Sequence, residues 1–148
     1  MESKMEHEIA AILAGASDMT IATIRPDGYP QATTVSYVTH GMTIYFGAAA
    51  DSQKARNIAG CDKISLTVNL PYKTWDEIRG ISLGGRAARV TDPDEIVRVG
   101  DLMLHKFPQV ADYAAEGGEG ISLFRISPDA ISLLDYRKGF GHTEFVTI

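Results

Sequence analysis

Two side chains that can bind a phosphate stand at the predicted start of a short helix. Ser52 and Lys54 follow a strand-like segment and precede the helical run at 55–59, which Gly60 can end as a C-terminal cap. The first amides of a helix have no partner within it and carry the positive end of its dipole, so they favour a phosphate. Ser52 adds a hydroxyl and Lys54 a positive charge. Taken alone, these residues favour the simpler alternative, an ordinary N-cap at Asp51 or Ser52 beside a solvated lysine.

The strands before this helix must position it. Residues 31–39 alternate between two sets of side chains, and residues 42–47 alternate again after His40 and Gly41, so the pattern predicts a hairpin. Helices are expected before Gly15 and at 92–106, where an Asp-Pro-Asp-Glu sequence suits a helix start. Further strands are predicted at residues 19–24, 63–68, 78–90, 121–127 and 130–136. Many strands with few helices indicate a mainly β protein, a small barrel.

Composition limits the classes of function. The chain has 148 residues, a mass of 16.0 kDa and 45% hydrophobic residues, which suits one globular domain over residues 1–148. A net charge of -5 with scattered basic residues argues against a nucleic-acid or anionic-membrane surface. No basic leader precedes an apolar run, and no run approaches the ~20 apolar residues of a membrane helix. The single cysteine, Cys61, suits a reducing compartment, so we expect a cytoplasmic protein.

Metal and nucleophile motifs are missing from the sequence. It contains no Cys/His spacing for zinc, no His-Glu-x-x-His, no P-loop and no nucleophile elbow. We therefore predict no metal site, and the residues name no catalytic acid or base.

Aromatic residues in two polar segments are further candidates for ligand binding. Trp75, the only tryptophan, lies in the proline-containing segment 69–77 and is predicted to cover a flat ligand, to form a dimer contact or to plug one end of the barrel. The segment 135–143 combines Tyr136 and Phe140 with two basic residues, His142 and flexible glycines. It can reach a ligand, or it can be a surface loop held by packing of Phe140.

The order of these motifs resembles the pyridoxamine 5'-phosphate oxidase superfamily, the flavin-binding split β-barrels. The similarity comprises Asp27-Gly28-x-Pro30, a strand rich in threonine and valine, a glycine-marked turn, an aromatic strand and Ser52-x-Lys54 before a short helix. It continues through the strands at 63–68 and 79–90. The resemblance implies a split β-barrel of six to seven antiparallel strands of Greek-key type, and a homodimer with flavin sites at the subunit interface.

The resemblance also implies a set of cofactor-binding residues. Ser52 and Lys54 align with the pair that holds the cofactor phosphate in the family, and the strand at Thr33, Thr34 and Val35 aligns with the one that lines the flavin ring. The further candidates are Asn57 on the helix and Trp75, Tyr136 and His142, which would close the site from either subunit.

The chain departs from oxidases that act on pyridoxamine phosphate. It has Thr33 where they have arginine, Gln53 where they have a second basic residue, no glutamine near Gly80 and no C-terminal arginine-histidine motif. We therefore predict an FMN-dependent oxidoreductase with a different small-molecule substrate.

Two alternatives use other cofactors. A reductase that binds the deazaflavin F420 would need basic residues for its acidic tail, such as Arg56, Arg79 or Arg137. A non-enzymatic flavin or haem binder would use His142 or His40 as an iron ligand. Absorption of the purified protein distinguishes the three.

Overall fold

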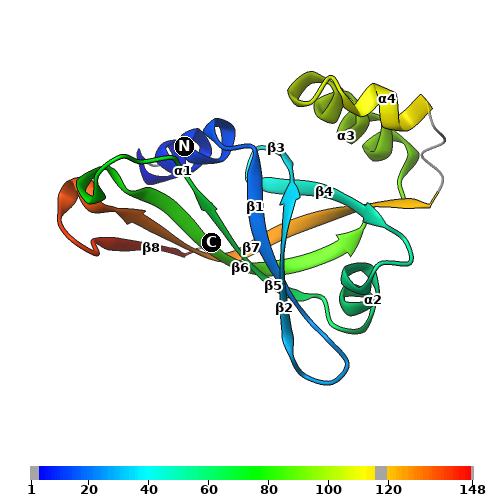
Figure 1. Ribbon diagram of the computed structural model, residues 1–148, viewed down its shortest axis with the longest axis horizontal. Coiled ribbons are helices and arrows are strands. Elements are labelled where there is room, and N and C mark those ends of the chain that lie inside the picture. Colours follow the sequence, from blue (N-terminus) through cyan, green and yellow to red (C-terminus); the bar gives the residue numbers. More distant parts are fainter. Residues whose placement is uncertain (1–3, 116–119, 148) are drawn as a thin grey trace.

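A curved antiparallel sheet with helices at its margins forms the structure. The computed structural model describes residues 4–115 and 120–147, and within this part of the chain eight strands form one sheet (Figure 1). The strand order is β2-β1-β5-β6-β7-β4-β3, and β8 pairs with β7. The predicted mainly β split barrel is confirmed, with eight strands in place of six to seven.

The element bounds are as follows. The strands are β1 (Asp18–Ile24), β2 (Pro30–Ser36), β3 (Val38–His40), β4 (Thr43–Ala49), β5 (Lys63–Asn69), β6 (Arg79–Arg89), β7 (Ile121–Asp135) and β8 (Thr143–Thr147). The helices are α1 (Lys4–Gly15), α2 (Gln53–Gly60), α3 (Pro93–Lys106) and α4 (Val110–Ala115), with short 3-10 turns η1 (Trp75–Glu77) and η2 (Tyr136–Lys138). Among the described residues, no helix is long and apolar enough to cross a membrane.

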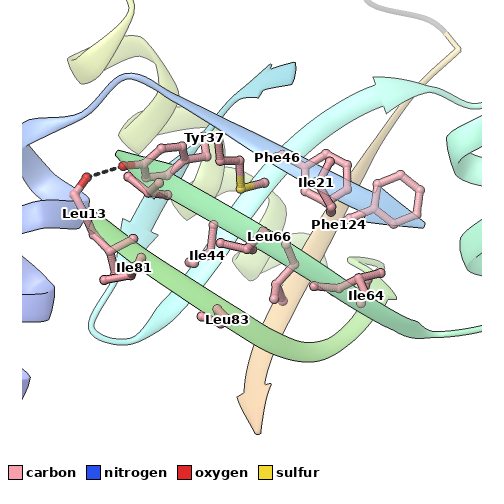
Figure 2. Packing of buried hydrophobic residues seen from close by; sticks show 14 of the residues in the cluster. Leu13, Ile21, Tyr37, Ile44, Phe46, Ile64, Leu66, Ile81, Leu83 and Phe124 are labelled. Atoms are coloured by element: carbon pink, nitrogen blue, oxygen red, sulfur yellow. Dashed lines mark hydrogen bonds between the residues drawn. The ribbon is translucent and has the colours of Figure 1, made fainter. Parts of the chain in front are cut away.

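The core lies inside the curve of the sheet. β5 shows the pattern that builds it, since Ile64, Leu66 and Val68 are buried and the residues between them are exposed. Phe46 on β4 stacks on Phe124 of β7 with ring centroids 5.2 Å apart (Figure 2). Apolar residues of α1 and α2 join the same cluster. α1 and α2 therefore each cover part of the core.

The segment predicted as one strand at residues 31–39 is two strands. Tyr37 separates β2 from β3, its ring is fully buried, and its hydroxyl donates a hydrogen bond of 2.5 Å to the carbonyl of Leu13 at the end of α1 (Figure 2). β2 pairs with β1, and only β3 pairs with β4. The predicted hairpin therefore forms around His40 and Gly41 between β3 and β4, but only residues 38–40 take part in it before the turn.

The segment predicted as two strands around Pro128 is one long strand, β7. Its register against β6 shifts between Gly84, which pairs with Ala130, and Gly85, which pairs with Pro128. Asp129 is the extra residue of this bulge, which bends the strand without ending it. The C-terminal segment, expected to be a loop through residue 143, returns as β8 along the second half of β7.

The helix predictions are confirmed. Ser52 is the N-cap of α2, and Asp92 caps α3 with Pro93 in the first turn. The C-cap of α2 is Cys61, one residue after the predicted Gly60. α3 is attached to the sheet by Glu95, which accepts hydrogen bonds from the Tyr45 hydroxyl at 2.8 Å and from Arg125 at 2.6 Å.

The bulge allows a matched test of packing at two adjacent glycines. A Cβ at Gly85 would lie 2.5 Å from the carbonyl oxygen of Ser127, whereas a Cβ at Gly84 would meet no atom within 4 Å. We expect Gly85→Ala to lower the free energy of unfolding by roughly 1–3 kcal/mol, because backbone must move. Gly84→Ala should change it by less than about 0.5 kcal/mol. Urea unfolding measures both, and equal effects would contradict the bulge geometry.

Candidate functional site

The N-terminus of α2 offers an anion two free amides. The Ser52 hydroxyl accepts a hydrogen bond from the Ala55 amide at 3.2 Å, and the Ser52 carbonyl accepts from the Arg56 amide at 3.1 Å. The amides of Gln53 and Lys54 precede the first amide that donates a hydrogen bond within the helix, and they have no partner among the described residues. Ser52 is thus an ordinary N-cap, and the positive end of the helix is still open to an anion.

Lys54 carries a positive charge at this helix end. Its side chain is half-buried, and within residues 4–115 and 120–147 it forms no ion pair or hydrogen bond. Burial lowers its pKa, because a cation loses hydration there. A lysine in this position is stabilised by an anion, and the described residues supply none.

Asn57 attaches α2 to the sheet. Its side chain is 1% exposed and donates hydrogen bonds of 3.0 Å to the Thr23 hydroxyl on β1 and to the Gln31 amide oxygen on β2. Its own oxygen accepts from Gln53 at 2.8 Å. Because Lys54 precedes Asn57 by three residues, it lies on the same side of α2, toward β1 and β2. Asn57 was predicted to contact the cofactor, and in this chain its amide positions the helix.

The three residues predicted to line a flavin ring point to two sides of β2. Burial alternates along this strand, so Thr33 and Val35 share the half-buried face with Gln31, whereas Thr34 is exposed on the other face. The Thr33 hydroxyl is buried and has no hydrogen-bond partner among the described residues. An unpaired buried hydroxyl is costly. Thr33 and Lys54 therefore present two unpaired polar groups to the region between β2 and α2.

The remaining predicted residues form a separate group. Trp75 belongs to η1, and Tyr136 and His142 flank the turn between β7 and β8. This group lies at the end of the molecule that carries α1 and β8, whereas α2 lies at the opposite end (Figure 1). Trp75 is 66% exposed, so it does not plug the barrel. One chain does not bring the two groups of predicted residues together.

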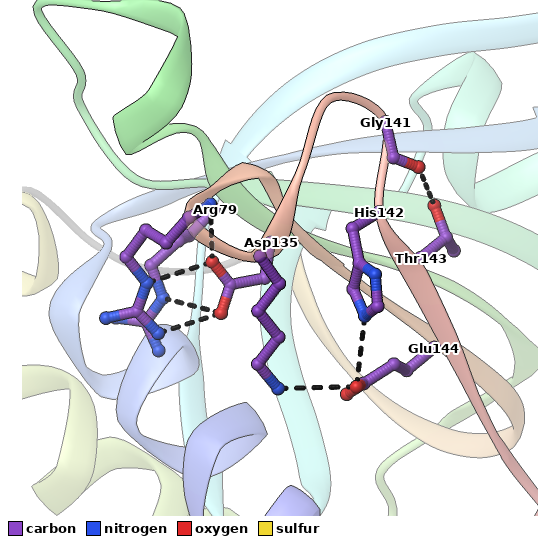
Figure 3. A network of polar contacts seen from close by, with 8 residues as sticks. Arg79, Asp135, Gly141, His142, Thr143 and Glu144 are labelled. Atoms are coloured by element: carbon purple, nitrogen blue, oxygen red, sulfur yellow. Dashed lines mark hydrogen bonds and ion pairs between the residues drawn. The ribbon is translucent and has the colours of Figure 1, made fainter.

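A buried carboxylate, which the sequence interpretation missed, holds the second group. Asp135 is 0% exposed and accepts hydrogen bonds from the backbone amide of Arg137 at 3.1 Å, its Nε at 2.9 Å and its Nη2 at 2.8 Å (Figure 3). Arg79 Nε lies 4.0 Å from the same carboxylate. The bonds from Arg137 hold the pKa of Asp135 at about 2. Asp135 is the N-cap of η2. Its position at the end of a strand, two residues before an arginine, could have identified this role from the sequence.

His142 has a partner in the same region. Its Nε2 lies 3.1 Å from Glu144 Oε1, which also accepts a hydrogen bond of 3.3 Å from Lys138 (Figure 3). These bonds, first from His142 and then from Lys138, lower the pKa of Glu144. Among the described residues, no group of three or more His, Cys, Asp or Glu side chains could hold a metal ion.

These features define a split-barrel protein in which the N-terminus of a helix beside the sheet is open to an anion. Residues 5–135 match the family described as pyridoxamine 5'-phosphate oxidase, and the chain belongs to this family. No curated protein matches the sequence significantly.

Solved structures share the fold. A conserved hypothetical protein from Mycobacterium tuberculosis is 27% identical with a TM-score of 0.80, over 97% of this chain and 92% of that one. A haem-binding protein from Mycobacterium smegmatis is 20% identical with a TM-score of 0.84, over 99% of this chain and 59% of that one. HutZ, the haem storage protein from Vibrio cholerae, is 18% identical with a TM-score of 0.71, over 85% and 91%.

The low pKa of Asp135 predicts how stability changes in acid. A carboxyl whose pKa is about 2 when folded and 3.8 when unfolded stabilises the fold above pH 4, and this contribution is lost as the pH falls toward 2. Its size is about 2 kcal/mol. Wild type should therefore be more stable than Asp135→Asn at pH 6, and the difference should shrink toward pH 2.5 in urea unfolding. Asp129→Asn, at an exposed ion pair with Arg86, is the control, and a constant difference for Asp135→Asn would contradict this role.

Proposed function

We propose that this protein binds FMN at the N-terminus of α2 and acts as a flavin-dependent oxidoreductase. The observation that carries the proposal is the unpaired, half-buried Lys54 beside two free helix amides, with the unpaired Thr33 hydroxyl on the neighbouring strand. A phosphate satisfies Lys54 and the amides together. Membership of the pyridoxamine 5'-phosphate oxidase family supports the same cofactor class.

The residues of this chain bind and orient the cofactor. Lys54, the Ser52 hydroxyl and the amides of Gln53 and Lys54 hold the phosphate, and Asn57 keeps this helix end against β1 and β2. Thr33 and Val35 provide the strand surface for the ring, and the Thr33 hydroxyl gains a partner there. FMN, when bound, supplies electron and hydride transfer.

The substrate differs from pyridoxamine phosphate in this proposal. Gln53 and Thr33 stand where oxidases acting on that substrate carry basic residues, and both are uncharged. Removing two cations from a site weakens the binding of a second phosphate.

A second copy of the chain completes the flavin site. The cavity of about 250 Å³ against α2 is lined by five alanines, Ile58, Arg89, Ser122 and Phe124, and by none of the residues proposed to hold FMN, so those residues need a further wall. A homodimer would supply the missing wall, as the family resemblance implies. Trp75, Tyr136 and His142 reach the flavin only if the second copy brings them to α2.

The deazaflavin alternative has less support than FMN. Arg79 and Arg137 both lie at Asp135, away from α2. Arg56 is on α2, but its guanidinium donates hydrogen bonds to the Asp51 carbonyl and the Gln53 side chain. Among the three basic residues considered for an acidic tail, only Arg56 is near Lys54.

Haem is the second candidate, because two structural neighbours are a haem-binding and a haem storage protein. Of the two candidate iron ligands, His142 bonds to Glu144 and His40 is exposed at the end of β3. The visible absorption spectrum of protein purified without added cofactor separates the candidates. A two-band flavin spectrum with FMN released on heating supports our proposal, whereas a haem band that disappears in His142→Ala would replace it.

Substitutions at the helix end should remove FMN and leave the fold intact. Lys54→Ala with Ser52→Gly removes the cation and the hydroxyl, while glycine retains most of the N-cap preference. Charge-assisted hydrogen bonds contribute about 1.5–3 kcal/mol each, so FMN affinity should fall by at least about 100-fold. Flavin absorbance per protein measures the loss, and circular dichroism measures the fold.

Lys63→Ala is the matched control, because Lys63 is an exposed lysine on β5. It should retain wild-type flavin content. Stoichiometric flavin in the Ser52→Gly, Lys54→Ala variant would overturn the phosphate assignment.

A further inference from the structure

Three aromatic rings at the end of the molecule opposite α2 surround a small cavity. Trp75 and Phe140 are 66% and 81% exposed, and their ring centroids lie 6.0 Å apart. Tyr136 meets Phe140 edge to face with centroids 5.3 Å apart. These three rings and Asp76 line a cavity of about 230 Å³. Clustered exposed rings around a cavity indicate a binding site, because single exposed apolar residues are usually scattered.

The backbone holds the rings in place. The amide of Tyr136 donates a hydrogen bond of 2.8 Å to the Ile78 carbonyl, which joins η2 to the end of η1. Gly139 and Gly141 have φ values of 136° and 73°, a region that favours glycine, and they turn Phe140 back onto Tyr136. The cavity is therefore formed by two short turns fixed to each other before any ligand binds.

The charged residue that lines this cavity is acidic. Asp76 is exposed, lines the cavity and accepts a hydrogen bond from the neutral Thr74 hydroxyl. The basic residues that follow Tyr136 are already paired, Arg137 with Asp135 and Lys138 with Glu144. The whole chain carries a net charge of -5. A cation is favoured at the cavity and an anion is disfavoured.

We propose that this cavity binds an alkylammonium cation, of the quaternary ammonium class. The faces of tryptophan, tyrosine and phenylalanine rings attract such cations, and a carboxylate beside them adds to this attraction. The cavity is small for a flavin ring and suits a compact head group. Its residues differ from those that hold the FMN phosphate in our proposal, and it is formed within one chain, so the inference does not rest on the proposed function.

Fluorescence of the full-length protein tests the proposal directly, because Trp75 is the only tryptophan. Choline chloride should change its emission in a saturable way. The uncharged isostere 3,3-dimethylbutan-1-ol should bind about 10-fold more weakly, because it has the same shape without the charge. Sodium chloride at equal concentration corrects for ionic strength.

Variants locate the binding. Phe140→Leu and Asp76→Asn should weaken choline binding by about 10-fold and about 3-fold respectively, and both residues are exposed, so the fold should persist. Tyr72→Leu is the matched control, because Tyr72 is an exposed aromatic residue three positions before Trp75 that does not line the cavity. It should bind choline as wild type does.

Several outcomes would overturn the proposal. These are a non-saturable response to choline, equal affinity for the isostere, and unchanged affinity in Phe140→Leu. A blue shift of Trp75 emission with rising protein concentration, without choline binding, would assign the rings to a contact between two copies. Loss of FMN from Phe140→Leu, with no choline binding in wild type, would assign them to the flavin site. If wild type did not bind FMN, the proposed function would be wrong, whereas the choline proposal would still be judged by choline binding alone.

Discussion

The long strand β7 is the constraint on which the rest of the structure depends. It pairs with β6 from Phe124 to Asp135, and its other edge pairs first with β4 and then with β8. The bulge at Asp129 lets one strand serve both halves, because it bends the strand while backbone pairing continues on either side. The first half of β7 supports β4, which leads into α2, and the second half ends at Asp135, which caps η2.

At the α2 end, polar residues divide into those that hold the structure and those left for a ligand. Asn57, Gln53, Gln31 and Thr23 satisfy one another through hydrogen bonds of 2.8–3.0 Å. Lys54 on the same helix and the Thr33 hydroxyl on β2 have no partner in the described part of the chain. Buried polar groups are normally paired, so unpaired ones beside a satisfied network indicate where a ligand binds.

The two ends of the molecule have opposite electrostatic character. The α2 end presents free amides and an unpaired lysine, which favour an anion. At the other end Arg137 and Lys138 are paired with Asp135 and Glu144, and Asp76 lies among exposed aromatic rings. The two sites that we propose would therefore take ligands of opposite charge, and they lie at opposite ends of the molecule (Figure 1).

The parts of this protein that the sequence predicts depend on local rules. The alternation in β5, the N-cap at Ser52 and the Asp92-Pro93 helix start are visible because their causes lie within a few residues. The order of motifs also indicated the family, and so the split barrel was expected.

Long-range pairing decided the rest. Tyr37 breaks a strand-like segment because its hydroxyl bonds to α1, 24 residues away, and β7 continues past Pro128 because β6 pairs with it on both sides of the bulge. Sequence cannot reveal that Thr33 is unpaired, that Asp135 is buried or that Trp75 meets Phe140, since each depends on neighbours remote in the chain. The sequence by itself determined which residues could bind a ligand, and only the tertiary structure decided that they form two separate groups, because side chains far apart in sequence meet only through strand pairing.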